Sequence, residues 1–316
     1  MDGIGVEVDF DGASVVVTAT NAVAEALFGP RLVIPRAEIA AATLTPARPL
    51  RSGVLELTMR DGGRHRLRFP HEQRPAFAEL AARLRPGAVV LHGRGSFDQA
   101  VTGESHCFTA LRALTGSGTG ERVTVAELRP DDDGVRVLMD DHVVGHLPPE
   151  AVDAYGPALR QVAVALCRAR LWWSYEQRGL GFIAAVSLDL ADPAEVLPLN
   201  EPDPGPHVEL PPGRTYPLRT EYLETLAAAL AKAYCPGRGL VYGSLHAEDG
   251  TVAVRVDGRR VGALPTTTAA AFAPLVRRFA AAGLTCYADV ALTGTAHAIE
   301  ARLRAAAPED ILPGLY

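Results

Sequence analysis

The chain has 316 residues and a formal net charge of −6 at pH 7, with 48% hydrophobic and 22% charged residues. This composition excludes a largely disordered chain and provides enough sequence for two or three globular cores. The first residues show no basic and apolar leader pattern, and no apolar run is long enough to cross a membrane. We therefore expect a cytoplasmic protein without a membrane span.

Cysteine and arginine usage narrows the class of protein further. The four cysteines, Cys107, Cys167, Cys235 and Cys286, lie tens of residues apart with no metal-ligand spacing. This pattern favours a reducing compartment and predicts neither a disulfide framework nor a zinc site. Among 31 basic residues Lys232 is the one lysine, so the coding bias of a GC-rich bacterium explains the abundance of arginine without nucleic-acid binding.

Residues 1–86 are predicted to form a β-rich domain that ends in a helix. Apolar residues alternate with smaller or polar ones over residues 6–10, 15–17, 55–59 and 67–69. This period of two is typical of half-buried strands, and Asp11-Gly12 supplies a turn between the first two. A helix beginning near Glu72 places Phe77 and Leu80 on one face.

Two short motifs in this domain carry a family resemblance. They are a Phe10-Asp11-Gly12 turn and a Gly-x-Leu-x-Leu strand over residues 53–57. The domain resembles the bacterial pleckstrin-homology-like (PH-like) family, which implies a strongly bent sheet plugged by its C-terminal helix and a surface for protein partners. Arg64, Arg66 and Arg68 alternate along one strand, a pattern that suits an acidic peptide or phosphate and that a solvated sheet face explains equally.

An internal repeat dominates the rest of the chain. Residues 143–159 align without gaps on residues 260–276, a spacing of 117, and six of 17 positions are identical. The same spacing extends upstream, so we expect one α+β fold in both copies, with Tyr155 and Phe272 buried alike. The predicted bounds of the copies are 95–200 and 213–316, joined by a Pro-rich linker over 193–212.

A five-residue step inside each copy carries a second resemblance. The first copy has Val144-Gly145-His146-Leu147-Pro148, preceded by Val101-Thr102-Gly103-Glu104 and followed by a last strand at 185–190; the second has Val261-Gly262-Ala263-Leu264-Pro265. These motifs resemble the HIRAN family, whose modules recognise single-stranded DNA or its ends through stacked aromatic rings. The expected fold is therefore α+β: a bent PH-like sheet with a C-terminal helix, then two tandem, small HIRAN-like modules of β-barrel and helix.

Candidate binding residues follow from the resemblance and from charge. The resemblance places His106 and His146 of the first copy, and Tyr222 of the second, at family binding positions. Residues 95–200 hold 8 basic and 15 acidic side chains, whereas residues 213–316 hold 11 and 9. Because phosphate contacts dominate nucleic-acid affinity, we expect the arginines of the second copy to outweigh His146. These arginines are Arg255, Arg259, Arg260, Arg277 and Arg278.

Two other readings stay open. Solvated hairpin and helix ends explain the arginines without a ligand, and the chain is then a protein-interaction or structural adaptor with no nucleic-acid binding. An enzyme has little support, since His106-Cys107 lacks an orienting acid and residues 116–120 lack the lysine of a phosphate loop. We expect a non-enzymatic adaptor without cofactor or metal, in which Trp172 and Trp173 point to opposite faces of a strand.

Overall fold

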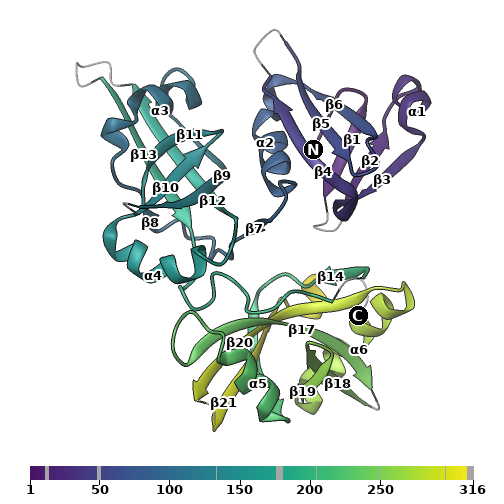
Figure 1. Ribbon diagram of the computed structural model, residues 1–316. Coiled ribbons are helices and arrows are strands. Elements are labelled where there is room, and N and C mark those ends of the chain that lie inside the picture. The colour runs from purple at the N-terminus through teal and green to yellow at the C-terminus, as the bar shows by residue number, and fades with distance from the viewer. Residues whose placement is uncertain are drawn as a thin grey trace. The chain divides into compact units, whose positions relative to one another are not determined.

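The computed structural model describes residues 1–10, 14–47, 51–132, 134–175, 181–203, 205–248, 250–295 and 297–311. The chain forms two compact units, Met1–Leu190 and Ala191–Tyr316. Both units are α+β with strands predominating, and their sheets curl towards barrels (Figure 1), which confirms the predicted class at that level. No helix among the described residues is long and apolar enough to cross a membrane.

The first unit begins with two antiparallel sheets around one core. One sheet contains β1 (Val6–Phe10), β2 (Ser14–Ala19) and β3 (Arg31–Pro35), and the other β4 (Ile39–Thr45), β5 (Gly53–Met59) and β6 (Arg64–Phe69). Helix α1 (Ala22–Phe28) follows β2, and α2 (Arg74–Arg83) follows β6. Phe69 and Phe77 stack with ring centroids 4.3 Å apart, so α2 closes this core as its periodicity predicts.

One predicted detail of this domain differs in the structure, and another lies outside the described residues. Helix α2 begins two residues later than expected, because a 3-10 turn, His71–Gln73, precedes it. Pro75 lies in the first turn of α2, where its missing N–H leaves no helical hydrogen bond unmade. The expected Asp11-Gly12 turn lies outside the described residues.

Both repeats contain the same elements in the same order. The first repeat runs through α3 (Phe108–Leu114), β9 (Gly120–Asp131), β10 (Gly134–Met139), β11 (His142–His146), α4 (Pro149–Leu159), β12 (Val164–Tyr175) and β13 (Phe182–Asp189). The second runs through α5 (Leu223–Leu230), β17 (Arg238–Glu248), β18 (Thr251–Val256), β19 (Arg259–Ala263), α6 (Thr266–Ala281), β20 (Thr285–Thr295) and β21 (Ala298–Ala305). Short strands complete each sheet: β7 (Ala88–Val90) and β8 (Gln99–Ala100), then β14 (His207–Glu209), β15 (Arg214–Pro217) and β16 (Arg219–Thr220).

The strand order of the two repeats is also the same. It is β11-β10-β9-β12-β13-β8 in the first and β19-β18-β17-β20-β21-β15 in the second, with β7 and β14 parallel to β12 and β20. Each repeat has a register shift at the same place, after Val137 and after Val254, which are 117 residues apart. Tyr155 on α4 and Phe272 on α6 are both buried, at 8% and 0% exposure. The prediction of one fold at a spacing of 117 is confirmed.

One extended segment closes each curled sheet into a near-barrel. In the first repeat the Val101 N–H donates to Val186 O on β13 (3.1 Å), and the next residue, Thr102, exchanges backbone hydrogen bonds with His146 on β11. In the second repeat β15 pairs with β21, and β16 pairs with β19. The two outer strands of each sheet are therefore bridged by a single stretch of chain.

Gly145 and Gly262 lie where these closing segments cross the third strand of each repeat. A Cβ on Gly145 would lie 2.6 Å from the carbonyl oxygen of Thr102, and one on Gly262 would lie 2.5 Å from that of Arg219. Both distances are too short for any side chain, so each position requires glycine. The two predicted equivalent glycines have the same structural role.

The Pro-rich segment 193–212 contacts the second repeat along much of its length. The Leu199 N–H donates to Leu240 O (2.8 Å), and both carboxylate oxygens of Glu195 accept from Arg304 at 2.6 and 2.8 Å. Strand β14, within the same segment, pairs with β20. This part of the chain is therefore ordered against the second unit, which begins at Ala191. A short helix, α7 (Pro308–Ile311), follows β21.

Candidate binding groove

An open groove in the second repeat collects several of the residues that the sequence singled out. It lies between the segment that enters α5 and the start of β19, and we call it the α5 groove. Its lining residues are Thr220, Glu221, Tyr222, Leu223, Glu224, Thr225, Arg259 and Arg260. Three of the predicted binding residues, Tyr222, Arg259 and Arg260, therefore meet in one place.

Tyr222 is held in an unusual backbone conformation at the edge of the groove. Its φ is 53°, in the left-handed region that bulky residues rarely adopt, and it precedes the first turn of α5. The neighbouring Glu221 N–H donates to Val261 O (2.8 Å), and the Thr225 N–H donates to Tyr222 O (3.1 Å). The residue is 68% exposed. Local strain of this kind clusters at binding sites, where the surrounding structure maintains it.

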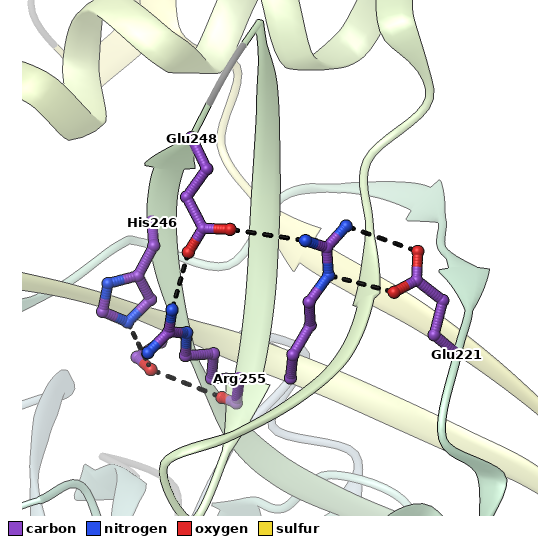
Figure 2. A network of polar contacts seen from close by, with 6 residues as sticks. Glu221, His246, Glu248 and Arg255 are labelled. Carbon is purple, nitrogen blue, oxygen red and sulfur yellow. Dashed lines mark hydrogen bonds and ion pairs between the residues drawn. The ribbon is translucent and has the colours of Figure 1, made fainter.

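The arginines of the groove are not equally available to a ligand. Figure 2 shows a network in which Glu248 accepts from Arg255 Nη2 (2.7 Å) and also lies 3.4 Å from Arg260 Nη1. Arg260 Nε lies 3.0 Å from a carboxylate oxygen of Glu221 on its other side. Two of the predicted phosphate ligands, Arg255 and Arg260, thus already have carboxylate partners. Within the described ranges, the exposed Arg259 forms no ion pair.

Charge counting over residues 213–316 therefore overstated the free positive charge at this site. The groove contains the carboxylates of Glu221 and Glu224 beside its two arginines. Arg255 belongs to the network but not to the groove lining, and Arg277 and Arg278 are exposed near the end of α6, outside the groove. The attraction for a phosphate rests mainly on Arg259.

The two histidines predicted in the first repeat lie on elements that pack against each other. His106 ends a 3-10 turn, Glu104–His106, which packs against β11, where His146 is the last residue. A Cβ on Gly103, at the start of that turn, would lie 3.6 Å from His146 Nδ1. Both histidine side chains are exposed. The structure thus brings three of the predicted residues together in the α5 groove, whereas Arg255, Arg277 and Arg278 lie outside it and the two histidines belong to the first repeat.

The network beside the groove includes a serine and a histidine that sequence reasoning missed. His246 Nε2 lies 3.0 Å from Ser244 Oγ, the distance of a nucleophile and its base. Ser244, however, is 3% exposed, and its hydroxyl donates to Arg255 O (3.4 Å). A buried hydroxyl used in this way cannot reach a substrate, so the pair supports the Arg255 backbone. Residues two apart on a strand lie on the same face, so the spacing of Ser244 and His246 was the sequence signal that could have revealed this contact.

Burial and, secondarily, the positive charge of Arg255 lower the pKa of His246 from its ordinary value. The unfolded chain then binds a proton more readily than the folded one. The stability that neutral His246 contributes is complete above its unfolded pKa of about 6.5 and is lost as the pH falls through the lower folded value. Replacing His246 by Gln should reduce the loss of thermal stability of the second unit on acidification. The exposed His297 provides the matched control, because His297→Gln should leave that loss unchanged.

The remaining candidate residues are more widely separated. Trp172 is 39% exposed, whereas the ring of Trp173 covers Gly120 on the opposite face, as predicted. Asp131 forms an ion pair with Arg136, and Asp133 lies outside the described residues. The cysteines at 107, 167, 235 and 286 are all unpaired. Among the described residues, no group of three or more His, Cys, Asp or Glu is arranged to hold a metal ion.

Comparisons with protein-family models, with curated proteins and with solved structures found no match to the chain in any of the three.

Proposed function

We propose that the chain is a non-enzymatic binding protein whose second repeat holds single-stranded DNA in the α5 groove. The observation that carries this proposal is Tyr222, an exposed ring on a strained backbone, beside Arg259 in an open groove. An exposed ring offers a stacking surface for any base, and Arg259, which forms no ion pair with another residue in the described part of the chain, is available to a phosphate. Glu221 and Glu224 limit the affinity, because they repel the backbone of the strand.

We also propose that the first domain is PH-like and that the two repeats are HIRAN-like. Two sheets around one core, closed by α2, support a PH-like first domain, and two closed sheets with matching helices support HIRAN-like repeats. In that arrangement the first domain binds protein partners while the repeats bind DNA or its ends. A cytoplasmic location is consistent with the free cysteines.

Fluorescence anisotropy with a short labelled single strand, at two salt concentrations, tests the proposal. Tyr222→Leu should weaken binding by about 5- to 150-fold, since stacking on an aromatic ring contributes about 1–3 kcal/mol per base and about 1.4 kcal/mol corresponds to a factor of ten. Arg259→Ala should weaken it and reduce the salt dependence by about one phosphate contact. His146→Ala should have a smaller effect than either, because its repeat is strongly acidic.

Arg278→Ala is the matched control, since it removes the same charge from an exposed site outside the groove. Equal losses for Arg259→Ala and Arg278→Ala would mean that binding is diffuse rather than located in the groove. Loss of binding with His146→Ala alone would identify the first repeat as the DNA-binding module.

A protein-interaction adaptor without nucleic-acid binding is the second candidate, and one surface favours it. On the outer face of the first-repeat sheet, Val123, Trp172 and Ile183 are 44%, 39% and 40% exposed. The guanidinium groups of Arg168 and Arg170 lie 5.2 and 5.5 Å from the ring centre of Phe97 on the same unit. Exposed aromatic and arginine side chains are enriched at protein interfaces. This candidate predicts no salt-dependent binding of oligonucleotides.

A further inference from the structure

The outer edge of β6 in the first domain has unpaired backbone groups. Strand β6 pairs with β5 on one side only. On the other side the Ile4 N–H donates to Arg68 O (2.7 Å), so Arg68 directs its backbone groups away from β5. Because this direction alternates along a strand, Arg64 and Arg66 direct theirs outward as well. No described residue pairs with the outward N–H and C=O groups of Arg64 and Arg66.

The side chains of the same three residues lie on the solvent face of the sheet. Leu67 and Phe69 alternate with them and are buried, at 1% and 0% exposure. Arg64 and Arg66 both form ion pairs with Glu56 on β5, yet their side chains remain 63% and 67% exposed. Glu56 balances one of the three positive charges, so this edge keeps a surplus of positive charge.

We propose that the edge of β6 accepts an extended acidic segment of a partner protein as an additional strand. Alternate residues of a strand lie about 6.6–6.8 Å apart, so acidic residues at every second position of the partner match the spacing of the arginines. The arginines repel basic strands, as charged residues on edge strands do, and attract acidic ones. This site is separate from the α5 groove and does not depend on DNA binding there.

The backbone of the edge favours a peptide over a nucleic acid. Arg64 and Arg66 each present an N–H donor and a C=O acceptor, and a peptide strand satisfies both kinds of group. The phosphodiester backbone of a nucleic acid carries acceptors only and leaves the carbonyl groups without a donor. A nucleic acid would therefore use the three guanidinium groups but not the edge itself.

The test uses the full chain and two labelled peptides of the same composition. In the first, Glu-Val-Glu-Thr-Glu-Val, the acidic residues alternate and share one face of a strand. In the second, Glu-Glu-Glu-Val-Thr-Val, they form a block. We expect the alternating peptide to bind at least tenfold more tightly. Equal affinity for the two peptides, or no binding of either, would overturn the proposal.

Two substitutions at one position separate backbone pairing from charge. Arg66→Ala removes one guanidinium group, whereas Arg66→Pro also removes the outward N–H, which forms no hydrogen bond with β5. We expect Arg66→Pro to bind the alternating peptide several-fold more weakly than Arg66→Ala, with both variants folded by circular dichroism. Equal affinity of the two variants would show that the edge takes no part in binding.

A short single-stranded oligonucleotide added as competitor distinguishes the remaining alternative. It should leave the alternating peptide bound to the chain. Displacement of the peptide at equal concentration would mean that the arginines form a general polyanion surface, and the proposal of strand addition would be wrong. If Arg66→Pro does not fold, the affinities of Arg64→Glu for the same two peptides test the proposal instead. In that case the tenfold preference for the alternating peptide should disappear.

Discussion

A chain carrying Gly262→Ala is expected to lose about 1–3 kcal/mol of stability in its second unit, since overpacking a well-packed site typically costs this much. The added Cβ would lie 2.5 Å from the carbonyl oxygen of Arg219, which belongs to the backbone of the closing strand. Backbone atoms cannot rotate away as a flexible side chain does. The clash therefore separates β16 from β19, and the hydrogen bonds that close the sheet are lost.

Gly145→Ala should have the same effect on the first unit. Its Cβ would lie 2.6 Å from Thr102 O, and the φ of Gly145, 155°, is one that residues with a side chain rarely adopt. Gly116→Ala and Gly205→Ala are the controls, because a Cβ there meets nothing within 4 Å and neither φ is in the left-handed region. Controls should change the stability by less than about 0.5 kcal/mol. Calorimetry of all four variants measures their thermal unfolding. If Gly262→Ala unfolded at the same temperature as the unchanged chain, Gly262 would not be required for closing the sheet.

Closure of the sheet also explains why the Val-Gly-x-Leu-Pro step occurs twice. The glycine admits the closing strand, and the leucines that follow, Leu147 and Leu264, are 4% and 1% exposed. Their N–H groups donate to Val135 O and Val252 O, which are 117 residues apart. Pro148 and Pro265, the caps of the following helices, come next. The step thus stabilises the fold in both repeats, and its presence alone does not locate a ligand.

The repeat was the part of the fold that could be predicted best. A gapless alignment carries the same pattern of apolar residues into both copies, and this pattern determines which face of each strand is buried. The prediction therefore extended to the equal burial of Tyr155 and Phe272, which the structure confirms. It did not depend on knowing the family of the chain.

The closing strands could not be predicted in the same way. Residues 214–220 contain a proline and alternate only weakly, and their partners on β21 and β19 lie far away in sequence. Short strands are determined by what surrounds them rather than by their own pattern. Helix α1 was missed because it has seven residues; its one clear signal is Asn21, whose side chain accepts from the Ala24 N–H (2.9 Å).

The candidate site, too, could be predicted from the sequence only in part. Tyr222, Arg259 and Arg260 were selected from the sequence and lie in one groove. Their availability to a ligand was beyond prediction, because the partners of Arg260 are 39 and 12 residues away, at Glu221 and Glu248. A count of charges over a region treats all of them as free, whereas the fold pairs opposite charges wherever its strands bring them together.

Asp189→Ala is expected to lower the stability of the first unit by about 3 kcal/mol, because hydrogen bonds to a buried charged group are among the stronger ones. Asp189 ends β13 and is 2% exposed. Its Oδ1 accepts the backbone N–H groups of Arg94 (2.6 Å) and Gly95 (2.7 Å), and Arg168 Nη1 lies 3.7 Å from Oδ2. The carboxylate therefore anchors the loop before β8 to the end of the sheet.

The same substitution should also loosen the structure at the outer face of the first repeat. The anchored loop carries Phe97, whose φ of 49° is strained for a bulky residue and whose ring contacts two arginine side chains. Asp189→Ala should speed hydrogen exchange at Arg94 and Gly95, and it should release Phe97 from this position. The exposed Asp98, in the same loop, is the matched control. If Asp98→Ala and Asp189→Ala unfold at the same denaturant concentration, the loop is held by other contacts.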